Sequence, residues 1–265
     1  MLKRMILRLL WRLENTIGAS SRVEKRRRIL SRYFNDIFGA TVAYGPFRGL
    51  KLAKEMGWSK GDRAAILFGL YEKEVLASLA SLSGSYESFI NLGAGDGYYA
   101  VGGVSSGMFR TAYCYEANEG SRKLVRKNAG LNAIDDRIHI FGSAAKGFHR
   151  EIPSVVLASA VLLVDIEGSE FDLLDESAFM AFQNSVIFIE LHEWFFEDGS
   201  IRLQKLKEDA SATHRLSEMT TGARDLSQFP ELDRLSDSDR WLVCSEGRPR
   251  RMSWLRLDPW TATSG

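Results

Sequence analysis

Residues 88–99 have the sequence SFINLGAGDGYY, in which a short apolar run leads into a Gly-x-Gly-x-Gly turn. A run of five largely apolar residues that ends in glycines is typical of a buried strand. Glycines at 93, 95 and 97 allow the backbone to turn tightly and let a ligand approach the main chain. In an open α/β sheet a nucleotide-like ligand lies at this place, beyond the carboxyl end of the first strand. The stretch therefore predicts an α/β fold with a ligand-binding loop.

The next apolar run, residues 111–116, ends in Glu116, which follows Gly97 by 19 residues. A carboxylate at the end of the second strand can accept hydrogen bonds from both hydroxyls of a ribose. The dinucleotide-binding fingerprint needs its third glycine one position later, where this chain has Tyr98. The spacing therefore disfavours an NAD-linked oxidoreductase, and a glycine-rich turn without a ligand is the other alternative.

Apolar runs and helical patterns alternate through the rest of the chain. We expect strands at 88–92, 111–116, 137–141, 160–166 and 186–192, and helices at 120–130, 170–183 and 200–212. Strands that are nearly all apolar and separated by helices predict a parallel sheet covered on both faces. Two late runs, 214–221 and 240–246, are expected to complete the sheet as an antiparallel pair at its edge. The predicted fold class is Rossmann-like α/β, doubly wound, with a mostly parallel seven-stranded sheet.

An N-terminal helical and hairpin extension is expected before this sheet. Residues 41–53 predict two short strands around the Gly45-Pro46 turn, and residues 62–82 predict a helix with Asp62 as its cap. We therefore divide the chain into a basic arm (1–35), a hairpin and helix extension (36–85) and a main domain (86–265).

Composition narrows the class of protein. The chain has 265 residues, of which 45% are hydrophobic and 26% charged, as in soluble globular domains. Two cysteines, Cys114 and Cys244, are too few for a disulfide framework or a cysteine zinc cluster. A net charge of +1 argues against a nucleic-acid partner, and no run of 18 apolar residues would span a bilayer. We expect a cytoplasmic protein with reduced thiols.

The basic arm concentrates positive charge. Residues 1–35 contain ten Lys or Arg and two Glu, a net charge of +8 that leaves −7 for the rest of the chain. Residues 2–17 predict an amphipathic helix with an apolar stripe. Such a helix could dock on its own domain or on a second copy in a homo-oligomer, or lie on an anionic membrane at its inner face. A nucleic-acid partner is not expected, because no groove-reading motif accompanies the charge.

Four segments together resemble class I S-adenosylmethionine-dependent methyltransferases: the glycine loop, YCYEAN (113–118), LLVDIEGSEFDLL (162–174) and VIFIELHEW (186–194). More narrowly, they resemble FkbM-type methyltransferases, whose hallmark is a strand that ends Asp-x-Glu-Gly-x-Glu, here residues 165–170. The resemblance covers about residues 86–195. It implies S-adenosyl-L-methionine as the cofactor and a hydroxyl of a sugar, glycan precursor or secondary metabolite as the methyl acceptor. Methylation of nitrogen or carboxylate, and a cofactor-binding module without catalysis, are the alternatives.

The resemblance also implies which residues hold the cofactor. Gly93, Gly95 and Gly97 would line its methionine end, Glu116 would hold the ribose, and Ser143 would lie near the adenine. The remaining residues assigned to the cofactor are their neighbours: Asn91, Ala94, Asp96, Ala117, Ala144 and Asp165. Relatives carry an acidic residue where this chain has Asn91, so we expect Asp96 or Asp165 to supply the missing charge. By the same resemblance the Tyr71-Glu72 segment would cover the cofactor or the acceptor; the alternative is an amphipathic helix with Glu72 in water.

Acidic residues and a histidine follow the fourth and fifth expected strands. Because alternate residues of a strand share a face, Glu190 and His192 should point the same way, and Glu193 the other. His192 is the predicted general base, since its ordinary pKa lies near 6.5, with Asp165 and Glu190 as further catalytic residues. A structural histidine oriented by Glu190 is the alternative. The cluster would also suit Mg²⁺ or Mn²⁺, although a divalent metal is not favoured.

Overall fold

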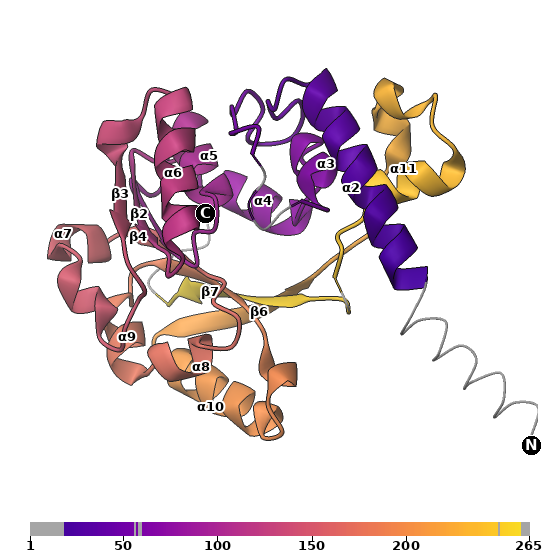
Figure 1. Ribbon diagram of the computed structural model, residues 1–265. Helices are drawn as coiled ribbons and strands as arrows, with labels where there is room; N and C mark the ends of the chain where they lie inside the picture. Colours follow the sequence, from indigo (N-terminus) through magenta and orange to yellow (C-terminus); the bar gives the residue numbers. More distant parts are fainter. Residues whose placement is uncertain (1–18, 56, 58–59, 249, 261–265) are drawn as a thin grey trace, which may run out of the picture.

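The computed structural model describes residues 19–55, 57, 60–248 and 250–260, which form a three-layer α/β arrangement around a seven-stranded sheet (Figure 1). The strands are β1 (Ser88–Leu92), β2 (Thr111–Tyr115), β3 (Ile138–Phe141), β4 (Ala160–Val164), β5 (Val186–Glu190), β6 (His214–Thr220) and β7 (Ser253–Pro259). Their order is β3-β2-β1-β4-β5-β7-β6, with β7 antiparallel to both of its neighbours and the other pairs parallel. The predicted fold class is confirmed. The amphipathic helix predicted at residues 2–17 lies outside the described residues.

Helices cover both faces of the sheet (Figure 1). Helices α5 (Tyr98–Ser105) and α6 (Glu119–Leu131) share one core with α2 (Ala19–Ile37), α3 (Arg63–Leu67), α4 (Lys73–Ala80) and α11 (Asp237–Cys244). The second core contains side chains of α7 (Ser154–Leu157), α9 (Glu176–Ala181) and α10 (Gly199–Ser211), and α8 (Glu170–Leu173) contacts α10. Short 3-10 turns are η1 (Asp135–Arg137), η2 (Phe148–Glu151), η3 (Glu193–Phe195), η4 (Leu226–Gln228) and η5 (Pro230–Leu232).

The central strands are buried on both faces. Along β1, Phe89 enters one core and Ile90 the other, as the alternation of side chains in a strand requires. Every residue of β1, β4 and β5 is buried, which explains why these strands have apolar sequences without a polar face.

The last strand of the sheet differs from the prediction. Residues 240–246 were expected to form a strand, but they belong largely to helix α11, and β7 lies further on at 253–259. The Ser236 side chain caps α11 by accepting a hydrogen bond from the Asp239 backbone, and acidic residues occupy the first turn. A short apolar run such as 241–244 suits either a strand or one buried face of a helix, so the spacing of its apolar residues could not distinguish the two.

The extension also differs from the prediction. The helix expected at 62–82 is divided into α3 and α4, because Gly69 and Glu72 have positive φ angles of 63° and 46°. Asp62 does not cap α3; its carboxylate accepts hydrogen bonds from the Arg27 side chain and the Gly247 backbone. The hairpin expected at 41–53 is reduced to a single antiparallel bridge within a series of turns.

Helix α2 lies on the main domain. Leu30 and Phe34 are buried in the same core as Phe89, and the Ser31 hydroxyl donates to the Gly61 carbonyl over 2.8 Å. The division of the chain at residues 35 and 85 stays a prediction. Of the helices in the described ranges, none combines the length and the apolar character that a transmembrane span requires.

Candidate active site at the carboxyl ends of the strands

The register of the sheet brings the predicted site residues to one edge. Leu92, the last residue of β1, pairs with Tyr115 of β2 and with Val164 of β4. The residues that follow these three positions are Gly93, Glu116 and Asp165, and β5 ends at the same edge in Glu190. Parallel pairing therefore places the glycine loop beside the acidic residues of the later strands, as expected for this fold.

The glycine loop needs its glycines for different reasons. Gly93, Gly95 and Gly97 have φ angles of 81°, 56° and 88°, a region that favours glycine. A Cβ on Gly93 would lie 1.7 Å from the Asp165 carbonyl oxygen, so the loops after β1 and β4 can meet only at a glycine. A Cβ on Gly97 would instead meet Val101 and Val125, where α5 begins against α6. Gly97 thus serves helix packing, while Gly93 and Gly95 line a cavity.

The Glu116 carboxylate is fixed in place. One oxygen accepts a hydrogen bond from the Gly95 backbone over 2.8 Å, and the other accepts from the Asn118 backbone over 2.7 Å. Each carboxylate oxygen can accept a second hydrogen bond. The group therefore stands ready for the hydroxyls of a ligand at the end of β2.

Two adjoining cavities follow the strand ends. The larger, about 360 Å³, is lined by Gly93, Gly95, Glu116, Tyr71, Asp165, Glu190 and Arg248, among others. The second, about 270 Å³, is lined by Ala117, Ser143, Ala144, Tyr115 and others, and shares Gly93, Glu116, Asp165 and Glu167 with the first. Their combined volume is in the range of small-molecule sites. Most of the residues assigned to the cofactor from the sequence thus lie on one continuous surface.

Four of the assigned residues do not line these two cavities: Asn91, Ala94, Asp96 and Gly97. Asn91 is 1% exposed, and neither polar atom of its side chain has a hydrogen-bond partner among the residues that the structure describes. Asp96 is buried near Arg63; burial lowers the pKa of Arg63, and the Asp96 charge partly opposes that shift. Since Asp165 lines both cavities, it is the better placed of the two acids to supply the charge that Asn91 lacks.

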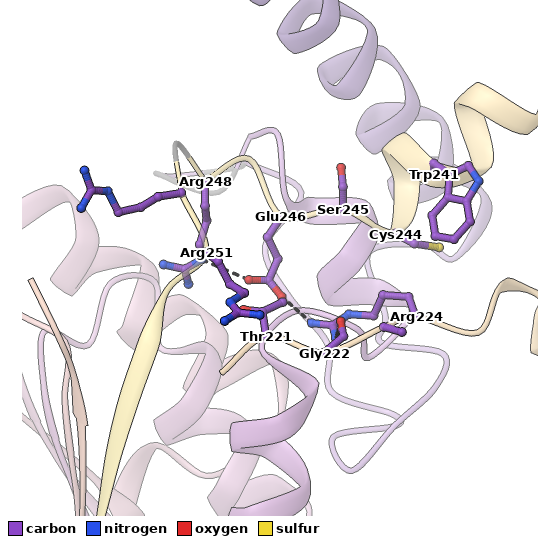
Figure 2. A pocket seen from close by; sticks show the side chains of 11 residues that line it. Thr221, Gly222, Arg224, Trp241, Cys244, Ser245, Glu246, Arg248 and Arg251 are labelled. Atoms are coloured by element: carbon purple, nitrogen blue, oxygen red, sulfur yellow. Dashed lines mark hydrogen bonds and ion pairs between the residues drawn. The ribbon is translucent and has the colours of Figure 1, made fainter. Parts of the chain in front are cut away.

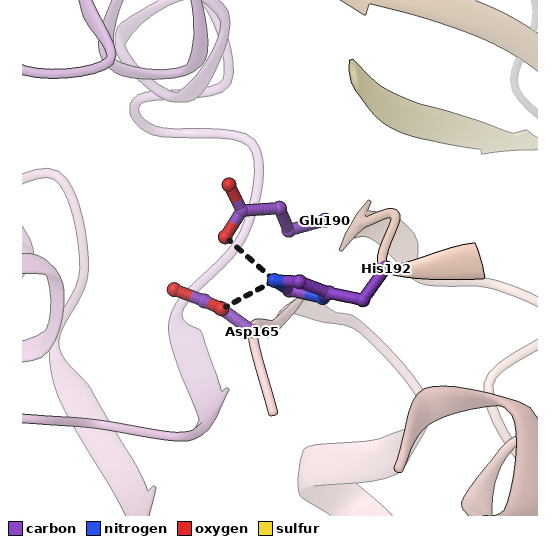
Figure 3. A group of neighbouring side chains, drawn as sticks. All are labelled: Asp165, Glu190 and His192. Carbon is purple, nitrogen blue, oxygen red and sulfur yellow. Dashed lines mark ion pairs between the residues drawn. The ribbon is translucent and has the colours of Figure 1, made fainter. Parts of the chain in front are cut away.

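The predicted catalytic residues come together (Figure 3). His192 is 2% exposed, and its Nε2 faces Glu190 at 3.7 Å and Asp165 at 3.9 Å. Glu190 and His192 thus point the same way, as predicted. A third carboxylate, Glu167, lies 3.6 Å from the same nitrogen. His192 itself does not line either cavity, whereas these three carboxylates do, so a ligand in the larger cavity would meet the carboxylates first.

Glu170, and not the Glu190 of the structural alternative, orients His192. Glu170 is fully buried and lies 3.2 Å from His192 Nδ1. The same carboxylate accepts hydrogen bonds from the backbones of His192, over 2.9 Å, and Gly168, over 2.8 Å. These contacts fix the ring and leave Nε2 directed toward the other carboxylates.

Arg248, which the sequence did not identify, joins the site to the extension. Its guanidinium contacts Glu190 at 2.5 Å and Glu246 at 3.1 Å, donates to the Tyr71 hydroxyl over 2.9 Å, and pairs with Glu72. The Tyr71-Glu72 segment thus covers the larger cavity, which agrees with its expected position. No local pattern marks Arg248, because its loop precedes the strand that the sequence misplaced.

Burial and charge set the protonation of this cluster. Burial, reinforced by the charges of Asp165 and Glu167, raises the pKa of Glu190. Burial also raises the pKa of Asp165, so this pair of carboxyls retains a proton more readily than two exposed acids. Burial lowers the pKa of His192, but the hydrogen bond to Glu170 and the nearby charges raise it overall.

The same cluster could hold a divalent cation. Asp165, Glu190 and His192 each offer one ligand atom, and these atoms lie within 4.8 Å of one another. The bond from His192 Nδ1 to Glu170 matches the way in which metal-binding histidines are oriented. Arg248 already contacts Glu190, however, and would compete with a cation for that carboxylate.

No protein-family model and no curated protein matches this chain in sequence. Solved structures of similar architecture include precorrin-6y C5,15-methyltransferase from Geobacter metallireducens, which is 11% identical, with a TM-score of 0.46 over 69% of this chain and 87% of that chain. TYW2 from M. jannaschii, solved in complex with AdoMet, is 13% identical, with a TM-score of 0.43 over 72% and 77%. The tRNA methyltransferase TrmK from B. subtilis is 8% identical, with a TM-score of 0.44 over 69% and 64%. Because each score is below 0.5, the fold assignment rests on the strand order and register of this chain.

Proposed function

We propose that the chain is an S-adenosyl-L-methionine-dependent methyltransferase that acts on a hydroxyl of a sugar, glycan precursor or secondary metabolite. The observation that carries this proposal is the fixed Glu116 carboxylate beside Gly93 and Gly95, in a cavity that continues to Asp165 and Glu190. A group suited to a ribose and groups suited to accept a proton thus line one surface.

The residues present fit the cofactor. Gly93 and Gly95 line the larger cavity beside Glu116, and the Glu116 carboxylate retains acceptor capacity for ribose hydroxyls. Ala117, Ser143 and Ala144 line the second cavity beside β2 and β3, where the adenine would lie. When bound, S-adenosyl-L-methionine supplies an electrophilic methyl group on its sulfonium sulfur.

The chain's own contribution is to orient the acceptor and take its proton. An acceptor hydroxyl in the larger cavity can reach Asp165, whose raised pKa makes it a stronger base than an exposed aspartate. His192 Nε2 lies 3.9 Å behind Asp165, beyond hydrogen-bond distance, and would need to approach as the acceptor binds. His192 as the general base stays a prediction, and Asp165 is the group that meets the acceptor first.

Calorimetric titration of the purified chain with S-adenosylhomocysteine, S-adenosylmethionine and NAD tests the cofactor assignment. We expect the first two to bind and NAD not to bind. Transfer of a radiolabelled methyl group to a panel of hydroxylated, amino and carboxylate acceptors then tests the reaction. Binding of NAD alone would contradict the proposal, and cofactor binding without transfer to any acceptor would favour a non-catalytic module.

A further inference from the structure

A third cavity lies beside the candidate active site, and Arg248 lines both. Its volume is about 400 Å³, within the range of sites for small molecules. The wall is formed by the segment after β6, by the end of α11 and, before β7, by residues 245, 246, 248, 250 and 251 (Figure 2). The cavity is thus built from the C-terminal part of the chain, next to the place where a methyl acceptor would lie.

The lining of this cavity is basic. It includes Arg224, Arg248, Arg250 and Arg251, against one carboxylate, that of Glu246. Glu246 lies between two of these arginines, 2.7 Å from Arg224 and 3.1 Å from Arg248 (Figure 2). Arg224 also contacts Glu74 at 2.7 Å. These ion pairs neutralise Arg224 and Arg248 and hold them in place.

The other two arginines have no such neutralisation. Arg250 and Arg251 are exposed, and neither contacts a carboxylate among the residues described here. The Arg250 guanidinium lies 4.5 Å from the centre of the Trp194 ring, a cation–π contact that orients it without removing its charge. The wall of the cavity thus carries two positive charges without a carboxylate partner, which favours an anion such as a phosphate group.

An aromatic surface completes the cavity. Trp241 of α11 is 53% exposed and lines the wall beside Cys244 (Figure 2). Large aromatic side chains usually bury most of their area, and a half-exposed ring in a cavity offers a flat surface on which another ring can stack. The cavity therefore combines a site for an anion with a platform for a ring.

We propose that this cavity binds the phosphate group of a phosphorylated carbohydrate, with Arg250 and Arg251 on the phosphate and Trp241 against the sugar ring. The inference rests on the proposed function, because it names the class of methyl acceptor. Arg248 lines both cavities, so the phosphate site would adjoin the cavity that contains Asp165.

Calorimetry at constant ionic strength with inorganic phosphate, glucose 1-phosphate, glucuronate and glucose tests this proposal. We expect glucose 1-phosphate to bind at least about tenfold more tightly than glucose. Arg251→Gln should lower the affinity for inorganic phosphate and for glucose 1-phosphate about tenfold. Arg110→Gln is the matched control, because Arg110 is 76% exposed and its ion pair with Glu87 spans 4.0 Å. Trp241→Ala should lower the affinity for glucose 1-phosphate and leave the affinity for inorganic phosphate unchanged.

Equal affinity for glucose and glucose 1-phosphate, or equal loss in the Arg251 and Arg110 variants, would overturn the proposal. Tighter binding of glucuronate than of glucose 1-phosphate would also overturn it, in favour of a carboxylate acceptor. S-adenosylhomocysteine is titrated into the wild-type chain and the same variants. If it binds the wild-type chain while neither phosphate does, the cavity inference alone fails; if it does not bind the wild-type chain, the proposed function fails.

Discussion

Replacing Glu116 tests the cofactor site directly. In the structure, hydrogen bonds from the Gly95 and Asn118 backbones hold the carboxylate before any ligand binds. A ribose hydroxyl would add a hydrogen bond to a charged acceptor, which contributes about 1.5–3 kcal/mol. Glu116→Ala should therefore weaken S-adenosylhomocysteine binding by about 10- to 150-fold. Glu116→Gln, which keeps one acceptor oxygen but loses the charge, should fall between the alanine variant and wild type.

The assay is calorimetric titration of the wild-type chain and both variants, with Glu119→Ala as the control. Glu119→Ala removes the same charge from a nearby position. The Glu119 side chain is 55% exposed and pairs with Arg122 on the surface of α6, so it does not line the cofactor cavities. Thermal unfolding of each variant shows whether the glycine loop survives the loss of its bond to Glu116. If Glu116→Ala unfolds at the wild-type temperature and binds S-adenosylhomocysteine with unchanged affinity, the assignment of this cavity to the cofactor is refuted.

Further predictions concern the chemistry and the fold. His192→Ala should lower kcat by about 100-fold with little change in S-adenosylhomocysteine affinity, whereas Asp165→Asn should lower both kcat and that affinity. If His192→Ala lowers the affinity and Asp165→Asn lowers kcat alone, Asp165 is the general base. If neutral His192 is the base, kcat should fall as the pH drops through a midpoint above 6.5, because the surrounding carboxylates raise its pKa; a midpoint that His192→Gln leaves unchanged belongs to another group. EDTA should leave activity intact, since Arg248 already contacts Glu190, and loss of activity that Mg²⁺ restores would instead establish a metal site. Gly93→Ala should lower the melting temperature by several degrees, because its Cβ would meet the Asp165 carbonyl. Gly107→Ala is the control: Gly107 also has a positive φ, but its Cβ would meet nothing within 4 Å, so this variant reports the effect of the φ angle alone. Deletion of residues 1–18 should reduce self-association or binding to anionic vesicles, as sizing and sedimentation at two salt concentrations would show; unchanged mass and lipid binding would exclude both roles.

The part of the candidate site that lies at the carboxyl ends of the parallel strands could be predicted from the sequence. A residue that directly follows a buried parallel strand lies at the same edge as its counterparts, so Gly93, Glu116, Asp165 and Glu190 could be grouped from the sequence. Glu170 and Arg248 could not be assigned their roles in this way. Glu170 reaches His192 from a short helix, and Arg248 reaches Glu190 from a loop 58 residues further along the chain. Such contacts depend on how loops close in space, which no local period encodes.

The sequence alone determined the five parallel strands, because each is a short, mostly apolar run, helical patterns lie between several of them, and the glycine loop marks the end of the first. It also determined that acidic residues gather at one edge of the sheet. Only the tertiary structure decided that residues 241–244 form a helix, because a four-residue apolar run can bury itself in either conformation until its neighbours are in place. It alone decided the division of the helix at Glu72, whose positive φ is maintained by contacts of its buried carboxylate with Tyr99 and Arg248. Those partners lie 27 and 176 residues away in the chain, so packing, and not local propensity, fixed the conformation of this segment of the site.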